Sequence, residues 1–266
     1  MSNDNWGDNA RIGVFIVGAE VVPEAEWWAM APPGVSIHAA RISAPTPWAK
    51  WQPDHSGVEI CTDLERGATQ FASMALSAVV VGHSSSSIMG GSGWDEAVIE
   101  RVGSISHPST QVTTNGLDCV QALRACSVKR PFLMFPPWFN EGIVSAGAAF
   151  FQGHGFQPPS SFRHIPEPKW ANFRPEHLYR ERMHIAQKSD LLMDQIIANC
   201  PDTADSVLIV GTGLRCVGII SALETALGKP VVTANQASLW RCLGLAGVET
   251  PVRGYGKLLE GARTLG

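Results

Sequence analysis

The stretch "SAVVVGHSSSSIMGG" (residues 77–91) joins a short apolar run to a histidine, four serines and two glycines. A β-branched run of this length that ends in Gly and small polar residues is typical of a buried parallel strand followed by a loop. The stretch "SVLIVGTG" (residues 206–213) has the same form, which indicates two similar halves. Ligands of open α/β sheets collect beyond the carboxyl ends of the strands, so residues 82–87 are expected to form one wall of a site.

The rest of the chain alternates between short apolar runs and longer segments with helical spacing. This alternation favours parallel strands joined by right-handed crossovers. The expected strands are residues 12–17, 35–40, 78–81, 131–135, 207–210 and 231–233. The expected helices are residues 23–30, 63–77, 94–102, 116–127, 139–152, 175–199 and 216–227.

Composition and charge exclude several classes of partner. Twenty basic and twenty-four acidic residues give a net charge of −4 without a Lys/Arg cluster, which argues against nucleic acid. No apolar run reaches the roughly 18 residues of a membrane span, and residues 12–19 lack the basic flank of a signal peptide. A cytoplasmic protein with no membrane partner is expected. Six cysteines without C-x-x-C spacing and eight histidines without an H-x-x-x-H pair predict reduced thiols and no metal site.

Six phrases, in order along the chain, resemble the maleate isomerase and arylmalonate decarboxylase branch of the aspartate/glutamate racemase superfamily. They are "RIGVFIVGAEVVPEAEWWAMAPPGVSIHAARI" (11–42), "GHSSSSIMGG" (82–91), "TTNGLDCVQALRA" (113–125), "FPPWFNEGIVSAGAAFF" (135–151), "VGTGLRCVGIISALE" (210–224) and "ANQASLW" (234–240).

The resemblance implies an α/β fold of two pseudo-symmetric Rossmann-like halves, each a short parallel sheet flanked by helices, with the active site in the cleft between them. The first half is expected to comprise residues 1–114 plus 234–266, and the second residues 115–233. The resemblance also implies a small-molecule substrate, no metal or organic cofactor, and a homo-oligomer. Members of the family commonly place one cysteine from each half on opposite faces of a small carboxylate substrate.

Both family cysteines are replaced in this sequence. The first motif, which resembles Cys-Thr-Ser-Gly-Ser, places His83 at the cysteine position. The second, which is similar to Cys-Thr-Asn-Leu-Arg, begins at Gly211. An asparagine that holds a substrate carboxylate corresponds to Glu20, and a tyrosine of the pocket corresponds to Trp138. The substrate group beside Glu20 is therefore expected to be an amide, a hydroxyl or a cation, unless Glu20 is protonated.

Three residues are candidates for catalysis. His83 has an ordinary pKa near 6.5, so it is expected to accept and donate protons near neutral pH. Glu20 is expected to pair with it, with a raised pKa if the cleft is dry. Ser84 carries a hydroxyl that is a candidate nucleophile with His83 as its base, although neighbours on one loop rarely align for that transfer.

The other candidates are expected to bind the substrate. Hydroxyl and backbone N–H groups at Ser85 and Ser86 would hold a carboxylate or an enolate oxygen. Gly211, Thr212 and Gly213 would form a matching cradle from the second half, and Trp138 would supply an apolar wall. Lys169 and Arg174 in the second half are further groups that would attract an anion.

The leading hypothesis is a cofactor-independent isomerase or lyase, either a cis-trans isomerase or a decarboxylase-like enzyme. It would act on a small carboxylate or carbonyl compound through an enolate-like intermediate, with His83 as acid and base. One alternative is a hydrolase of an amide or a cyclic imide, using Glu20 and His83 or the Ser84 hydroxyl. A second alternative is a non-catalytic small-molecule binding protein that has lost both thiols.

Overall fold

Two four-stranded parallel sheets form the framework of the protein, which is described by a computed structural model over residues 4–261. The strands of the first sheet are β1 (Ala10–Val17), β2 (Val35–Ile42), β5 (Ala78–Val81) and β6 (Gln111–Thr114). Those of the second are β7 (Pro131–Phe135), β8 (Ser161–Arg163), β9 (Ser206–Ile209) and β10 (Val231–Thr233). A separate antiparallel hairpin consists of β3 (Ala49–Trp51) and β4 (Val58–Ile60).

The two sheets share one strand order. The first runs β2-β1-β5-β6 and the second runs β8-β7-β9-β10, so each places its own first strand between its second and third. All pairings within them are parallel. In such sheets a crevice opens at the carboxyl ends of the two central strands, because the connections leave there in opposite directions. These central strands are β1 and β5 in the first sheet and β7 and β9 in the second.

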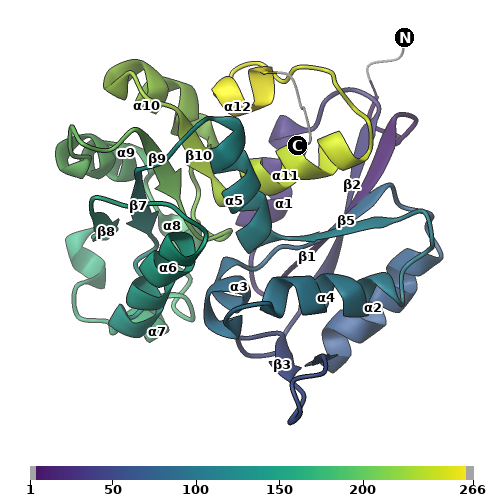
Figure 1. Ribbon diagram of the computed structural model, residues 1–266. Coiled ribbons are helices and arrows are strands. Elements are labelled where there is room, and N and C mark those ends of the chain that lie inside the picture. Colours follow the sequence, from purple (N-terminus) through teal and green to yellow (C-terminus); the bar gives the residue numbers. More distant parts are fainter. Residues whose placement is uncertain (1–3, 262–266) are drawn as a thin grey trace.

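Helices cover both sheets (Figure 1). In the first part of the chain they are α1 (Val22–Met30), α2 (Thr62–Ala72), α3 (Ser84–Gly90), α4 (Trp94–Gly103) and α5 (Asn115–Ala125). The following ones are α6 (Glu141–Gly153), η1 (Pro168–Trp170), α7 (Pro175–Leu178), α8 (Met183–Ala186) and α9 (Ser189–Asn199). The last are η2 (Val217–Ile219), α10 (Ile220–Leu227), α11 (Ala234–Leu245) and α12 (Lys257–Glu260).

The two central strands of the first sheet, β1 and β5, are buried on both faces. Ile12 and Val14 of β1 point into an inner core that continues through α1, α5 and α11 into the second sheet. Phe15, the next residue after Val14, points to the opposite face of the sheet, into a separate outer core formed with α2 and α4. This alternation follows from the two-residue period of a strand, and it explains why β5 is wholly apolar and β1 is apolar except for the exposed Arg11.

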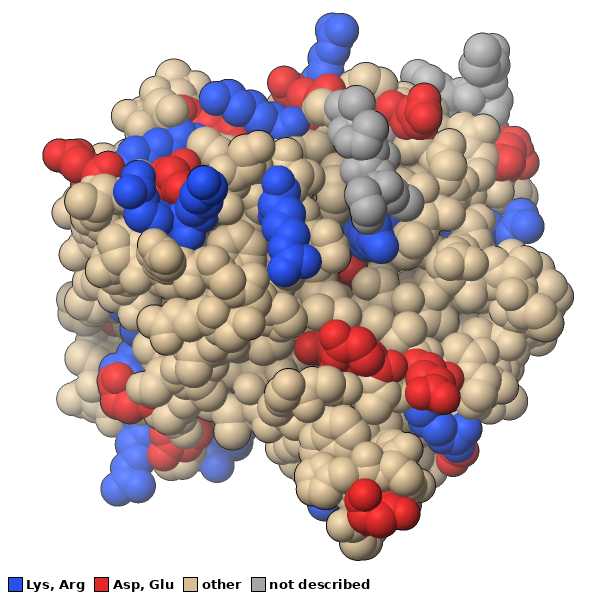
Figure 2. Space-filling model, in the orientation of Figure 1, with Lys and Arg blue, Asp and Glu red and all other residues tan. Residues whose placement is uncertain are grey.

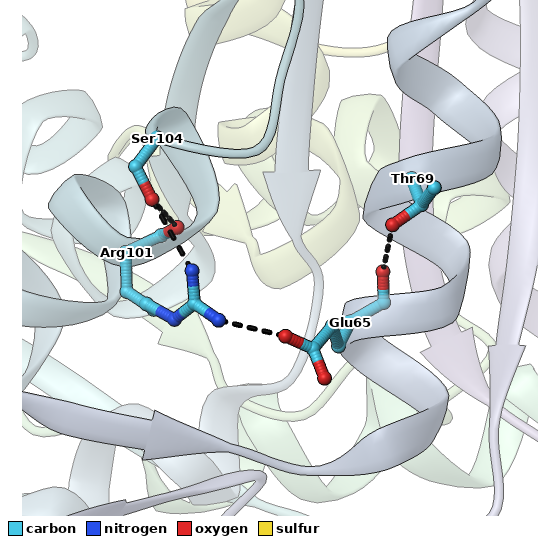
Figure 3. Close-up of polar contacts among 4 residues, drawn as sticks. All are labelled: Glu65, Thr69, Arg101 and Ser104. Atoms are coloured by element: carbon cyan, nitrogen blue, oxygen red, sulfur yellow. Dashed lines mark hydrogen bonds and ion pairs between the residues drawn. The ribbon is translucent and has the colours of Figure 1, made fainter.

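The outer helices are also joined by polar contacts (Figure 3). Arg101 on α4 forms an ion pair with Glu65 on α2 at 2.7 Å, and its guanidinium also donates to Ser104. Such an exposed pair adds at most about 1 kcal/mol, so apolar packing provides most of the attachment of α2 and α4. Basic and acidic side chains are interspersed on the face drawn in Figure 2, with a broad uncharged area between them.

The α/β class and the parallel sheets are confirmed. The strands expected at residues 78–81, 131–135 and 231–233 have these bounds in the structure. The single helix expected at residues 175–199 is wrong: α7, α8 and α9 are separate, and Arg182 between them has φ +61°. The proposed boundaries of the two halves stay a prediction. Within residues 4–261, no helix is both long and apolar enough to span a membrane.

Candidate active site

A cavity of about 210 Å³ lies where the carboxyl ends of the central strands of both sheets meet. Eight of the eleven residues proposed from the sequence line it: Glu20, His83, Ser84, Ser85, Trp138, Gly211, Thr212 and Gly213. The lining residues that sequence reasoning missed are Val17, Thr46, Phe139, Ile143 and Tyr179. The segments that follow β1, β5, β7 and β9 therefore converge on one cavity.

His83 sits between β5 and α3, with its ring stacked on Trp48 at a centroid distance of 4.2 Å. Nδ1 of His83 is 2.8 Å from Oγ of Ser86, and that Oγ accepts the backbone N–H of Trp48 at 2.9 Å. Nδ1 is the acceptor that remains for the buried Ser86 hydroxyl hydrogen, so the neutral ring carries its proton on Nε2. His83 can therefore present an N–H donor to the cavity.

Burial lowers the pKa of His83 from its ordinary 6.5 to about 3, because a charged ring would lose its hydration. The expectation that His83 titrates near neutral pH is therefore wrong for this site. At pH 7 the ring is neutral, and it serves better as a hydrogen-bond donor than as an acid.

Ser86 does not reach the cavity, which corrects its place among the substrate-binding candidates. Its side chain is fully buried and bonded to His83 and Trp48, and its backbone N–H donates to the carbonyl of His83 at 3.0 Å. The reason is the start of α3 at Ser84, which turns successive serine side chains in different directions. Ser86 instead orients His83.

Ser84 and Ser85 both line the cavity but differ in their partners. The Ser84 hydroxyl donates to Oδ1 of Asn115 at 2.5 Å. The Ser85 hydroxyl has no hydrogen-bond partner within residues 4–261, so it is free to meet a ligand.

Glu20 follows β1 and extends from the first sheet to the loop after β9. Its Oε2 accepts from Oγ1 of Thr212 at 3.5 Å, and Arg41 holds its backbone carbonyl at 2.7 Å. A Cβ atom at Gly213 would lie 2.2 Å from Oε1 of Glu20, so the approach of the carboxyl group requires a glycine there. Glu20 is 3% exposed, although a charged carboxylate normally avoids such burial.

The Glu20 carboxyl is a weak acid in this environment. Burial raises its pKa from 4.5 to about 8, while the nearby Tyr179 and Thr212 hydroxyls act in the opposite direction. The Tyr179 hydroxyl approaches Glu20 without reaching good hydrogen-bond geometry and has no other partner among residues 4–261. At neutral pH Glu20 is largely protonated, which is the condition for donating a proton.

Tyr179 closes the cavity from the segment between α7 and α8. Its ring stacks on His184 at 4.6 Å and meets Trp138 edge-on at 5.8 Å. Sequence reasoning misses Tyr179 as a site residue because it assigns this residue to a single helix over residues 175–199. Its rarity is the only signal, since it is one of two tyrosines in the chain.

Comparison with known proteins identifies the fold. Residues 182–259 match the family model described as arylmalonate decarboxylase. The maleate isomerase Iso from Pseudomonas putida S16 is 17% identical, with a TM-score of 0.78 over 95% of this chain and 98% of its own. The chain has the fold of maleate isomerase and arylmalonate decarboxylase. The family-model match and these structures confirm, at the level of the fold, the resemblance that the sequence motifs indicated.

Two further solved structures of the superfamily have the same architecture. An arylmalonate decarboxylase is 20% identical, with a TM-score of 0.71 over 94% of this chain and 98% of its own. The Nocardia farcinica maleate cis-trans isomerase is 17% identical, with a TM-score of 0.74 over 94% and 98%. No curated protein matches the chain in sequence.

Gly211, which the sequence motifs predict to stand at the second cysteine position of the family that the chain resembles, leaves no room for a side chain. Its φ is +95°, which L-residues rarely adopt, and a Cβ there would lie 2.9 Å from Cγ of Pro136. No cysteine lines the cavity within residues 4–261. Cys216 is the thiol nearest in sequence, and it is buried with a pKa well above its ordinary value because a thiolate there would be desolvated.

Charged groups are also sparse in the lining of the cavity. Lys169 and Arg174 are both exposed and lie outside the cavity, which corrects the expectation that they attract an anion there. Within the described residues no three His, Cys, Asp or Glu side chains are grouped so as to hold a metal ion. Glu20 is thus the one carboxyl group of the cavity, and no Lys or Arg of residues 4–261 faces it.

Proposed function

We propose that this protein is a cofactor-independent lyase or isomerase that forms an enolate-like intermediate from a small carboxylate or carbonyl compound. Glu20 donates the proton to carbon, and the neutral His83 ring donates a hydrogen bond to the developing oxyanion. Glu20 thus takes the proton-transfer role first expected of His83.

The observation that carries this proposal is the position of the Glu20 carboxyl. It comes from the first half of the chain, yet it contacts Thr212 and lies against Gly213 in the second half. The superfamily motif has its cysteine two residues before Gly213. Glu20 therefore places an acidic proton beside the loop from which a thiol is missing.

A decarboxylation step can be written with these groups. The bond from the α-carbon to the departing carboxylate breaks, its electron pair moves toward the adjacent carbonyl oxygen, and CO₂ leaves. His83 Nε2–H and the free Ser85 hydroxyl stabilise the resulting oxyanion. Glu20 then transfers its proton to the α-carbon, and water restores the proton to the carboxylate.

Isomerisation would use the same Glu20 carboxyl group in its ionised form. Ionised Glu20 would remove a proton from one carbon and return it to another. A Nocardia farcinica maleate cis-trans isomerase variant carries a covalently bound succinylcysteine intermediate. A cysteine adduct of that kind has no counterpart here, because no thiol lines the cavity within residues 4–261.

The hydrolase alternative is less well supported. A serine nucleophile needs a base that takes its proton, but the Ser84 hydroxyl donates to the amide oxygen of Asn115. An amide oxygen is not a base near neutral pH.

Location in the cytoplasm and assembly into a homo-oligomer stay predictions.

The test is CO₂ release and deuterium incorporation at the α-carbon, measured by NMR in D₂O with small malonate half-amides, alkylmalonates and 3-oxo acids. The wild type is expected to act on at least one class, and Glu20→Gln to lose at least about 100-fold in rate, as expected for loss of a general acid. Glu249→Gln, which changes an exposed carboxylate outside the cavity, is the matched control. Undiminished turnover by Glu20→Gln would overturn the proposal, and binding without turnover would favour the non-catalytic alternative.

A further inference from the structure

Behind Ser84 lies a buried polar cluster that the proposed mechanism does not use. Ser84 is 4% exposed and forms part of the cavity wall, and its Oγ is 2.5 Å from Oδ1 of Asn115. Asn115 begins α5 and is fully buried. The hydroxyl of this cavity-lining serine is thus hydrogen-bonded to a side chain that no ligand can reach.

The orientation of the Asn115 amide follows from its other neighbours. Nδ2 is 2.9 Å from the carbonyl oxygen of Ala234 and 2.9 Å from Oγ of Ser238. A carbonyl oxygen only accepts hydrogen bonds, so the amide nitrogen must be on this side, with both of its hydrogens used. The amide oxygen then faces Ser84, and the Ser84 hydroxyl must donate to it.

The cluster also resists rotation of this amide. Ser238 lies near Asp118, one turn along α5 from Asn115, without reaching good hydrogen-bond geometry, and Asp118 accepts from Thr113 at 2.5 Å. Thr113, Asn115, Asp118 and Ser238 are all 5% exposed or less. Turning Asn115 would leave buried donors and acceptors unpaired, which is costly where water cannot replace the lost bond.

We propose that Asn115 sets the ligand preference of the cavity by holding Ser84 as a hydrogen-bond acceptor, an inference that rests on the function proposed above. The single hydrogen of Ser84 is committed to Asn115, so only oxygen lone pairs remain for the cavity. The site then selects a ligand that presents an amide N–H or a hydroxyl to Ser84, and it disfavours a ligand that presents a carbonyl or carboxylate oxygen there. Asn115 is a positioning residue that acts through Ser84.

The charges around the cavity favour the same class of ligand. Within residues 4–261 the lining holds the Glu20 carboxyl and no Lys or Arg. A second carboxylate on the ligand would meet the lone pairs of Ser84 without a compensating cation. The favoured substrates are therefore small carboxylates or carbonyl compounds whose other end is a primary amide or a hydroxyl.

Three matched compounds test this preference by calorimetric or NMR titration at pH 7: succinamate, levulinate and succinate. Succinamate and levulinate have the same charge and nearly the same shape, but levulinate has a methyl group in place of the NH₂ donor. The wild type is expected to bind succinamate about tenfold more tightly than levulinate, and succinate most weakly.

Two variants separate the roles of Ser84 and Asn115. Ser84→Ala is expected to bring the succinamate-to-levulinate affinity ratio close to one while leaving levulinate affinity nearly unchanged. Asn115→Ala frees the Ser84 hydroxyl to donate, so levulinate is expected to gain affinity and the ratio to fall. Ser92→Ala, an exposed serine outside the cavity, is the control and should keep the wild-type ratio.

The outcomes distinguish this proposal from the proposed function. A wild-type ratio near one, or a ratio that survives Ser84→Ala, overturns the preference for a donor. A ratio retained by folded Asn115→Ala overturns the role of Asn115, and if this variant does not fold, Ser84→Ala decides the proposal. Failure of the wild type to bind any of the three compounds at millimolar concentration contradicts the small-molecule site itself.

Discussion

The Glu26 carboxyl accepts a hydrogen bond from the backbone N–H of Cys216 at 2.6 Å, although 190 positions separate the two residues. The same Oε1 accepts the N–H of Val217 at 2.9 Å, and Oε2 accepts from Asn235 at 2.7 Å. Asn235 also donates to the carbonyl of Thr212 at 2.9 Å. Glu26 on α1 therefore fixes the loop that carries the second wall of the cavity.

Glu26→Gln is expected to lower the free energy of unfolding by about 1–3 kcal/mol. The new amide can still accept both backbone N–H groups, but its NH₂ would face the NH₂ of Asn235. Either orientation of Asn235 then loses a buried hydrogen bond. Urea denaturation of the variant beside wild type measures the loss, and equal stability would show that Glu26 does not hold the loop.

The contribution of Glu20 to the free energy of unfolding is expected to decrease as the pH rises. Its pKa is about 8 in the folded protein and 4.5 ordinarily, so between these values the unfolded chain releases a proton that the folded chain keeps. Rising pH therefore favours the unfolded state, by up to about 1.4 kcal/mol per pH unit for one group. The wild-type free energy of unfolding minus that of Glu20→Gln is expected to decrease from about pH 5 to about pH 8. Taking this difference cancels the other titrating groups, and a flat difference would contradict the raised pKa.

Gly213→Ala is expected to reduce activity almost as much as Glu20→Gln. The added Cβ would lie 2.2 Å from Oε1 of Glu20, so the carboxyl group must leave its place against the loop. Gly218→Ala is the matched control, because a Cβ there meets nothing within 4 Å and its φ is not positive. Full activity in Gly213→Ala would show that the position of Glu20 against this loop is dispensable.

Tyr179→Phe is expected to move the alkaline limb of the decarboxylation rate profile to higher pH. The Tyr179 hydroxyl lowers the pKa of Glu20, so its removal leaves the carboxyl protonated over a wider range. Decarboxylation by protonated Glu20 should decline above about pH 8 in the wild type, whereas isomerisation by the carboxylate should rise there. If Tyr179→Phe left the pH of the alkaline limb unchanged, a group other than Glu20 would control the pH dependence of the rate.

The sequence predicts the strand ends well because each buried strand is a short apolar run, and the residues that follow it must lie at the sheet edge. His83, Glu20 and Gly211 were located in this way. Side-chain direction is harder to predict: the sequence places Ser86 in the cavity because the serine run does not show that α3 begins at Ser84. Asn115 and Tyr179 depend on contacts between distant segments, which local periodicity does not reveal.

The inner core described above also bears on how a ligand enters. Ile12 and Val14 of the first sheet belong to the same apolar cluster as Phe132 and Leu208 of the second. Swinging the two sheets apart would expose this cluster to water. We expect passage into the cavity to depend on rearrangement of the segment that carries Tyr179, while the two sheets keep their mutual orientation throughout turnover.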